Sequence, residues 1–224
     1  MSFDGRLHAR PSPVSSVAPV GQQRLDIGGA RDSYFYVPPT YDPARPAPMV
    51  LLLHGAGGHA HDGLGLLRHL ADENGMILVA PASTAHTWDV IAVRAYGADV
   101  GLLDEALLHI FGHYAVDPAH LAIGGFSDGA SYALSLGLAN GDLFSHSIAF
   151  SPGYIARTAP RGQPAIFISH GRQDDVLPID PCSRRIVPQL RRADYAVRYE
   201  EFDGGHTIPA DIATMAAGWF LHHD

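Results

Sequence analysis

The chain has 224 residues, a length that fits one α/β domain able to bury its own hydrophobic core. Its composition, 46% hydrophobic and 17% charged residues, is ordinary for a folded domain, and no apolar run reaches the ~18 residues that a membrane-spanning helix needs. The formal net charge of −8 argues against a nucleic-acid partner, because neutralising phosphates requires clustered Lys and Arg.

The first residues of the chain carry no apolar periodicity. Residues 1–22 are rich in Pro and Ser and lack the apolar stretch of a signal peptide, so we expect a flexible N-terminal arm before a domain at residues 23–224. Cys182 is the only cysteine, so no intramolecular disulfide can form. These features predict a cytoplasmic protein and leave the oligomeric state open, a homodimer included.

Apolar runs and helical patterns then alternate along the chain. Met49–Leu53 is apolar at every position, which is typical of a strand covered on both faces. The alternation predicts an α/β fold with a mostly parallel, doubly wound sheet, helices on both faces and no large lid. The expected strands are Ser33–Val37, Met49–Leu53, Met76–Ala80, Leu121–Phe126, Ser147–Phe150, Ala165–Ser169 and Tyr195–Phe202. The expected helices are 62–73, 99–114, 128–139, 183–193 and 208–222.

One motif lies between a predicted strand and a predicted helix. Gly125-Phe-Ser127-Asp-Gly129 fits G-x-S-x-G, in which a serine occupies a sharp, strained turn. The two glycines are expected where side chains would collide, and the helix that follows points its positive end at the site. The motif therefore predicts that Ser127 is a nucleophile.

A serine nucleophile needs a base and an acid that orients the base. His206 follows the last predicted strand in a Gly-Gly-His turn, and both Asp174 and Asp175 follow the strand that ends at Ser169. The chain order Ser, Asp, His is the one expected of an α/β-hydrolase. We expect His54 and His170, at the ends of two other strands, to make structural hydrogen bonds under the site.

Three segments of the chain are recognisable. Residues 116–130 around Ser127, Leu51-Leu-Leu-His-Gly55 and His170-Gly-x-x-Asp174-x-x-x-Pro178 resemble the bacterial phospholipase/carboxylesterase family of α/β-hydrolases. The resemblance covers the chain from about residue 32 onward. It implies the α/β-hydrolase fold, it favours Asp174 over Asp175 as the catalytic acid, and it implies an oxyanion hole built from the backbone N–H groups of Ala56 and Asp128.

The resemblance also carries a functional expectation. It implies a serine carboxylesterase that needs no cofactor and cleaves small acyl esters or lysophospholipid-like substrates. Gly57, His61 and Trp88 are candidates to line the substrate pocket. A thioesterase or amidase of the same fold remains an alternative, as does a catalytically silent ligand-binding protein.

Three other interpretations of the sequence are weaker than that of a serine esterase. Gly55-Ala-Gly57-Gly58 after a strand imitates a dinucleotide fingerprint, but the acidic residue expected at the end of the next strand is missing. His59, His61 and Asp62 suit a metal, yet no other loop supplies a matching cluster, so we expect no metal site. Cys182 lacks the glycines of a nucleophile turn and is expected to be a structural thiol.

Overall fold

The computed structural model describes residues 4–14 and 18–222, so residues 1–3 and 15–17 of the predicted arm lie outside the described residues. Its strands are β1 Gly21–Leu25, β2 Ser33–Val37, β3 Ala47–Leu53, β4 Ile77–Ala80, β5 Val116–Phe126, β6 His146–Phe150, β7 Ala165–Gly171 and β8 Val197–Phe202. Its helices are α1 Ala60–Gly65, the 3₁₀ turn η1 Arg68–Leu70, α2 Asp89–Val93, α3 Ala98–His113, α4 Asp128–Ala139, α5 Ser183–Arg192 and α6 Ala210–His222.

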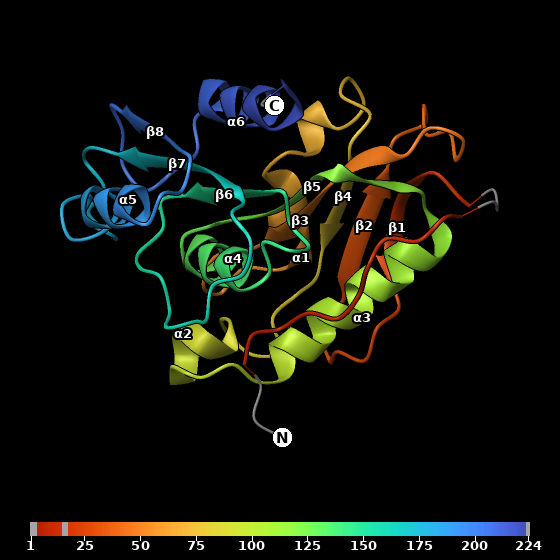
Figure 1. The fold of residues 1–224 in the computed structure, drawn as a ribbon, viewed down its shortest axis with the longest axis horizontal. Coiled ribbons are helices and arrows are strands. Elements are labelled where there is room, and N and C mark those ends of the chain that lie inside the picture. Colours follow the sequence, from red (N-terminus) through yellow and green to blue (C-terminus); the bar gives the residue numbers. More distant parts are fainter. Residues whose placement is uncertain (1–3, 15–17, 223–224) are drawn as a thin grey trace.

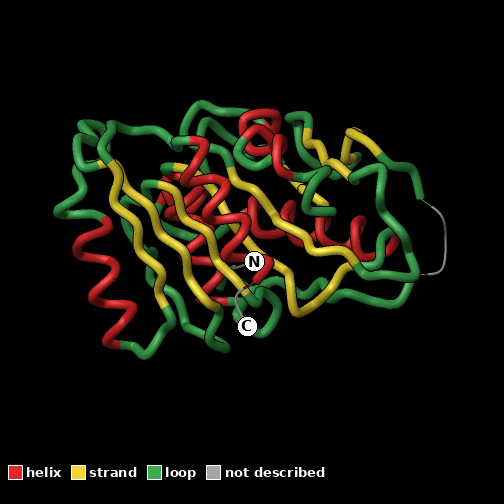
Figure 2. The backbone as a smooth tube through the Cα atoms, turned by 90° about the horizontal axis from the view of Figure 1, so that it is seen from above, coloured by secondary structure: helices red, strands yellow, loops and turns green. Residues whose placement is uncertain are grey.

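The eight strands form one sheet in the order β1-β2-β4-β3-β5-β6-β7-β8. All pairings from β4 across to β8 are parallel, and only β1 and β2 run antiparallel to their neighbours. Figure 1 shows helices on both sides of this sheet, and Figure 2 shows the strands side by side from above. The predicted fold class, a mostly parallel doubly wound sheet, is confirmed.

Strand β3 lies in the middle of the sheet and is buried on both faces. Met49, Leu51 and Leu53 pack with α3 and α4 on one side, whereas Val50 and Leu52 pack with α1 and α6 on the other. Successive strand residues point to opposite faces, so an all-apolar strand needs cover on both. The carboxyl ends of β3, β5 and β7 thus reach one edge of the sheet from a rigid core.

The predicted helix at 62–73 is wrong. The chain instead forms the short helix α1 and then the separate turn η1. Gly63 explains part of this difference, since a Cβ there would lie 2.9 Å from the carbonyl oxygen of Leu52, so α1 rests directly on the β3 backbone. Gly63 and Gly65 also lower the helix propensity of the segment.

The described part of the predicted arm packs against the domain. Leu7 and Ala9 are buried in the core, and the Leu7 N–H donates to the Oδ1 of Asn140 at 2.9 Å. Strand β1 then begins at Gly21, inside the predicted arm. Gly5, Leu7 and Ala9 are buried in alternation with more exposed residues, as in a strand. Leu7 is the only large apolar residue among them, so the alternation does not show in the sequence.

Candidate active site

The nucleophile motif forms a tight turn between β5 and α4. Ser127 has φ 57° and ψ −119°, a backbone conformation that costs a non-glycine residue of order 1–3 kcal/mol. A Cβ at Gly129 would lie 2.1 Å from the carbonyl oxygen of Leu53, and one at Gly125 would lie 2.5 Å from the Gly129 backbone. Both glycines are therefore required by close backbone contact, and the strain at Ser127 is held by the strands around it.

Two hydrogen bonds join the three predicted triad side chains. The Nε2 of His206 lies 2.9 Å from the Oγ of Ser127, and its Nδ1 lies 2.6 Å from the Oδ2 of Asp174. The loop that carries His206 is fixed against the end of β7, since a Cβ at Gly171 would lie 2.3 Å from the carbonyl oxygens of Gly204 and Gly205. The structure thus brings together residues that are up to 79 positions apart in the sequence.

The carboxylate of Asp174 is fully enclosed. Its Oδ1 accepts the backbone N–H groups of Val176 and Leu177 at 3.0 and 2.8 Å, while Oδ2 faces His206. Burial alone would raise the pKa of Asp174, but the hydrogen bonds from His206 and from these N–H groups outweigh it and lower the pKa. Asp175 is exposed, so Asp174 alone of the two carboxylates contacts His206.

Asp174 has a second imidazole beside it. The Nε2 of His170 lies 2.7 Å from the carbonyl oxygen of Leu177 and 3.2 Å from Asp174 Oδ2, and its Nδ1 lies 2.7 Å from the Oγ of Ser183. Because a carbonyl oxygen only accepts, Nε2 carries the proton and the Ser183 hydroxyl donates to Nδ1. Burial lowers the pKa of His170 and so favours this neutral form. His170 thus makes structural hydrogen bonds beside Asp174, as the sequence predicts.

His54 plays a similar supporting part on the other side of the nucleophile. Its Nε2 accepts the backbone N–H of Ser83 at 3.0 Å, and its Nδ1 lies 2.7 Å from the Gly55 carbonyl oxygen. Burial lowers the pKa of His54, in agreement with a neutral ring. The bonds tie the turn after β3 to the loop after β4.

The two predicted oxyanion-hole donors are backbone N–H groups. Among the described residues, neither the N–H of Ala56 nor that of Asp128 has a hydrogen-bond acceptor. Asp128 opens α4 immediately after Ser127, so its N–H also lies at the positive end of a helix. Gly57 follows Ala56 in the turn after β3 and has φ 71°. Its N–H donates to the carbonyl oxygen of His86 at 2.8 Å.

Two of the residues predicted to line the substrate pocket, Trp88 and His61, make contacts in other parts of the structure. Trp88 is fully buried, with its Nε1 donating to the His54 carbonyl oxygen at 2.8 Å and its ring stacked on Tyr132, so it supports the site from the core. His61 lies with its ring centroid 4.1 Å from that of Tyr34, on the side of β1 and β2. The sequence places both residues in loops near the strand ends, but it does not show which way a side chain turns.

Thr87 is a contact that the sequence does not reveal. Its hydroxyl donates to the Oδ2 of Asp128 at 2.6 Å, which fixes the segment before α2 to the start of α4.

The described residues contain no group of three side chains suited to a metal ion, and His59 instead contacts Arg31. Cys182 is buried, and burial raises the pKa of its thiol. None of the described helices is long and apolar enough to cross a bilayer.

Comparison with known proteins agrees with this geometry. The family described as "Putative esterase" matches residues 26–185, which is most of the chain. The chain belongs to this esterase family. The predicted resemblance to α/β-hydrolase serine esterases is thereby confirmed at the level of the family.

Named relatives of this family member are esterases. The feruloyl esterase C of Emericella nidulans is 25% identical over 78% of this chain and 66% of its own length. A protein of Nocardia uniformis subsp. tsuyamanensis with the same description as the family is 27% identical over 76% of this chain and 53% of its own. The chain thus spans between about half and two thirds of the length of these curated relatives.

Solved structures share the fold. The S-formylglutathione hydrolase of Staphylococcus aureus superposes with a TM-score of 0.71 at 16% identity, covering 92% of this chain and all of that one. A carboxylesterase of Mesorhizobium loti gives a TM-score of 0.65 at 20% identity, covering 90% of this chain and 99% of that one. At these identities the likeness establishes the α/β-hydrolase fold.

Proposed function

We propose that the protein is a carboxylesterase-type serine hydrolase that cleaves small carboxylic esters through an acyl-enzyme on Ser127. The observation that carries the proposal is the continuous hydrogen-bonded chain from Ser127 Oγ through His206 to the buried carboxylate of Asp174. Membership of an esterase family and esterase relatives support the same reaction class.

The reaction divides into two acyl transfers. Ser127 Oγ attacks the ester carbonyl carbon while its proton passes to His206 Nε2, and the carbonyl oxygen takes up the negative charge. When the C–O bond of the ester breaks, His206 returns that proton to the departing alcohol. His206 then takes a proton from water, the resulting hydroxide attacks the acyl carbon, and the acid leaves as Ser127 regains its proton.

The backbone and the buried acid lower the barrier of both steps. The N–H groups of Ala56 and Asp128 are suited to receive the oxyanion, and each such donor contributes roughly 3 kcal/mol to the transition state. Asp174 keeps the proton of neutral His206 on Nδ1, which leaves Nε2 free to accept from Ser127. A single conformation of the imidazole thus serves both as base and as acid.

Hydrolysis of a p-nitrophenyl ester series, from acetate to long acyl chains, tests the proposal. Wild type and Ser127→Ala are assayed in parallel, with thermal unfolding showing that both are folded. We expect turnover by wild type and at least a 10³-fold loss in the variant. Equal turnover by both would remove Ser127 as the nucleophile, and no turnover by either would favour a catalytically silent ligand-binding protein.

A further inference from the structure

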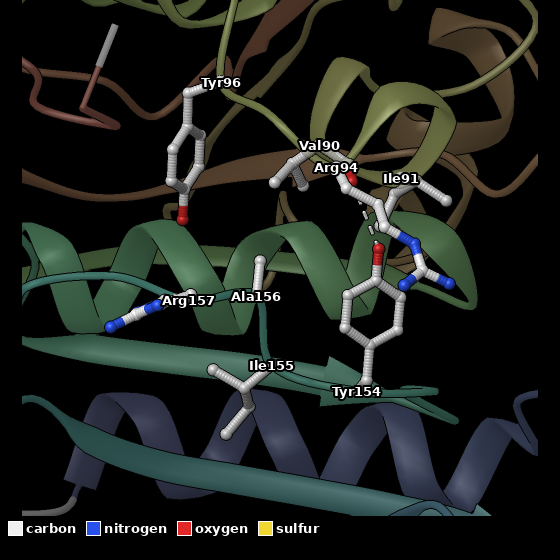
Figure 3. Close-up of a pocket in the computed structure, with 8 residues that line it drawn as sticks. All are labelled: Val90, Ile91, Arg94, Tyr96, Tyr154, Ile155, Ala156 and Arg157. Carbon is white, nitrogen blue, oxygen red and sulfur yellow. Dashed lines mark hydrogen bonds between the residues drawn. The ribbon is translucent and has the colours of Figure 1, made fainter.

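A cavity of about 530 Å³ opens beside α4, within the size range of small-molecule sites. Helix α2 and the turn after it form one wall, and the segment after β6 forms the other (Figure 3). The cavity is lined by Val90, Ile91, Arg94, Tyr96, Tyr154, Ile155, Ala156 and Arg157. The elements that carry these residues follow β4 and β6, so the cavity opens at the sheet edge where the triad lies.

Both walls begin next to the nucleophile. The first is fixed by the Thr87 hydroxyl, which donates to Asp128, the residue after Ser127. The second is fixed by the N–H of Gly153, which donates to Ser131 Oγ at 2.9 Å. Ser131 lies one helical turn after Ser127, and its hydroxyl donates to the Ser127 carbonyl oxygen at 3.2 Å. These bonds hold the two segments that form the cavity beside the first turn of α4, which Ser127 directly precedes.

The charge of the cavity is unusual for this chain. The protein has 15 Lys and Arg against 23 Asp and Glu, yet the only charged side chains that line the cavity among the described residues are Arg94 and Arg157. Neither guanidinium makes an ion pair or a hydrogen bond within the described part of the chain. Arginine presents a planar set of donors that matches a carboxylate, and here two such sets have no protein acceptor.

Arg94 is also held in a costly backbone conformation. It ends α2 with φ 57° and ψ 28°, in the left-handed region that favours glycine. The conformation places its side chain beside the ring of Tyr154, whereas Tyr96 and Arg157 lie at the other end of the cavity (Figure 3). Tyr154 is held in turn by its hydroxyl, which donates to the Val90 carbonyl oxygen at 3.3 Å.

The remaining lining is apolar or aromatic. Four of the lining side chains are aliphatic, those of Val90, Ile91, Ile155 and Ala156. The two tyrosines present their rings. A ligand that matches all of these features has an apolar or aromatic body and ends in an anionic oxygen group. Arg94 and Arg157 are both exposed, and a wholly apolar acyl chain would make no use of their guanidinium groups.

We propose that this cavity binds a substituent of the substrate that carries an anionic oxygen group such as a carboxylate, so that half-esters and carboxyaryl esters are the preferred substrates. The proposal rests on the esterase function proposed above. Arg94 and Arg157 lie at opposite ends of the cavity, so each offers a separate place for the anion. The apolar walls take up the chain or ring between the reacting carbonyl and the guanidinium that binds the anion.

The test compares two pairs of esters that differ in charge but not in shape. The first pair is the p-nitrophenyl half-ester of adipic acid and p-nitrophenyl 6-methylheptanoate, which place the group on the acyl side. The second pair is 4-acetoxybenzoate and 4-isopropylphenyl acetate, which place it on the alcohol side. The values of kcat/KM, corrected for spontaneous hydrolysis, are measured for wild type, for Arg94→Gln combined with Arg157→Gln, and for Arg185→Gln.

We expect wild type to prefer the anionic ester of at least one pair by about 10-fold or more. In the double variant, the ratio of kcat/KM for the anionic ester to kcat/KM for the neutral ester should fall about 10-fold or more. Arg185 lies exposed on α5, away from the cavity, so Arg185→Gln should behave as wild type. No preference in either pair, or a preference that survives the double substitution, would overturn the proposal.

Binding measurements separate this proposal from the esterase proposal. Monomethyl adipate is titrated calorimetrically into Ser127→Ala and into the triple variant that also carries Arg94→Gln and Arg157→Gln. Binding that the arginine substitutions weaken about 10-fold supports the anion site even if no ester is hydrolysed. Absence of binding to Ser127→Ala, together with no charge preference in turnover, would reject the site while leaving the esterase function intact.

Discussion

Replacing Asp174 by Asn tests the central hydrogen bond without changing the shape of the side chain. Asp174 Oδ1 accepts two backbone N–H groups, from Val176 and Leu177. An Asn amide must keep its oxygen at those donors, so its NH₂ group faces His206. The NH₂ donates to Nδ1 of the imidazole, and the proton of the neutral ring moves to Nε2, where it faces Ser127.

The expected cost follows from that tautomer. With a proton on Nε2, His206 can no longer accept the hydroxyl proton of Ser127, and the loss in kcat should be about 10⁴-fold, as for a wrong tautomer in a serine triad. Asp175→Asn is the matched control, because Asp175 is exposed and makes no hydrogen bond or ion pair among the described residues. It should stay within about 2-fold of wild type.

The assay is hydrolysis of p-nitrophenyl acetate at pH 7, with thermal unfolding of each variant beside it. The pKa of Asp174 is lowered on folding, so its contribution to stability is present above its ordinary pKa of ~3.9 and is lost only as the pH falls further. Wild-type Asp174 is therefore ionised at the assay pH. A folded Asp174→Asn within 10-fold of wild type, or a larger loss for Asp175→Asn, would refute the reasoning.

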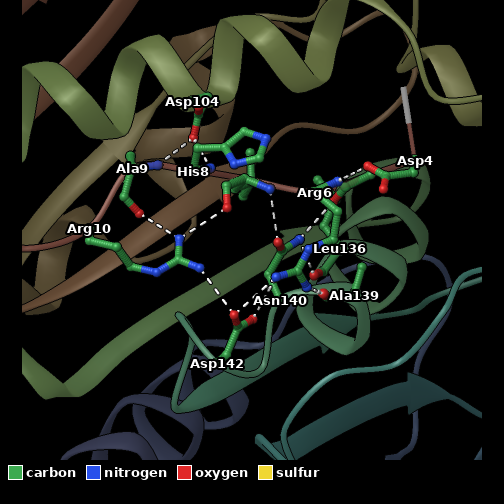
Figure 4. A network of polar contacts seen from close by, with 12 residues as sticks. Asp4, Arg6, His8, Ala9, Arg10, Asp104, Leu136, Ala139, Asn140 and Asp142 are labelled. Atoms are coloured by element: carbon green, nitrogen blue, oxygen red, sulfur yellow. Dashed lines mark hydrogen bonds and ion pairs between the residues drawn. The ribbon is translucent and has the colours of Figure 1, made fainter. Parts of the chain in front are cut away.

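Three further predictions concern the frame of the site. Gly129→Ala should abolish folding or activity, because its Cβ would overlap the Leu53 carbonyl oxygen; a folded, active variant in circular dichroism and esterase assays would contradict this. Asn140 lies in the polar network near the N-terminus (Figure 4). Asn140→Ala should lower the free energy of unfolding in urea by about 1–3 kcal/mol, since it leaves the buried Leu7 N–H without its acceptor. Glu201 has a pKa lowered to about 2, mainly by hydrogen bonds from Arg184, so Glu201→Gln should destabilise the protein above pH ~4.3 and progressively less as the pH falls toward 2.

Ser127, Asp174 and His206, which the two hydrogen bonds join, could be singled out from the sequence because each belongs to a short local pattern. Gly125 and Gly129 mark a turn that backbone contacts require, and the Gly-Gly pair before His206 marks a second one. The parallel sheet was equally predictable, since the apolar strands keep their period whatever packs on them. The position of the acid after the strand ending at Ser169 left Asp174 and Asp175, and the family resemblance favoured Asp174. Of the two, only Asp174 is buried.

The parts that escaped prediction depend on long-range contacts. Trp88 turns into the core because the His54 carbonyl oxygen accepts its N–H, a partner 34 residues away. Leu7 is buried because Asn140, at the end of α4, accepts its N–H across 133 positions. Helix α2 has only five residues, too few for an apolar period to show, so one wall of the cavity carried no signal in the sequence.

The triad and the cavity are carried by different elements of the fold, and this affects how the two can change in evolution. Ser127, Asp174 and His206 stand on the ends of strands and on turns locked by glycines, whereas the cavity is formed by α2 and the segment after β6. Those two segments are connections between strands and belong to no strand of the sheet. Under the proposed function, changes in these two segments would alter substrate preference while the residues proposed to carry the reaction stay in place.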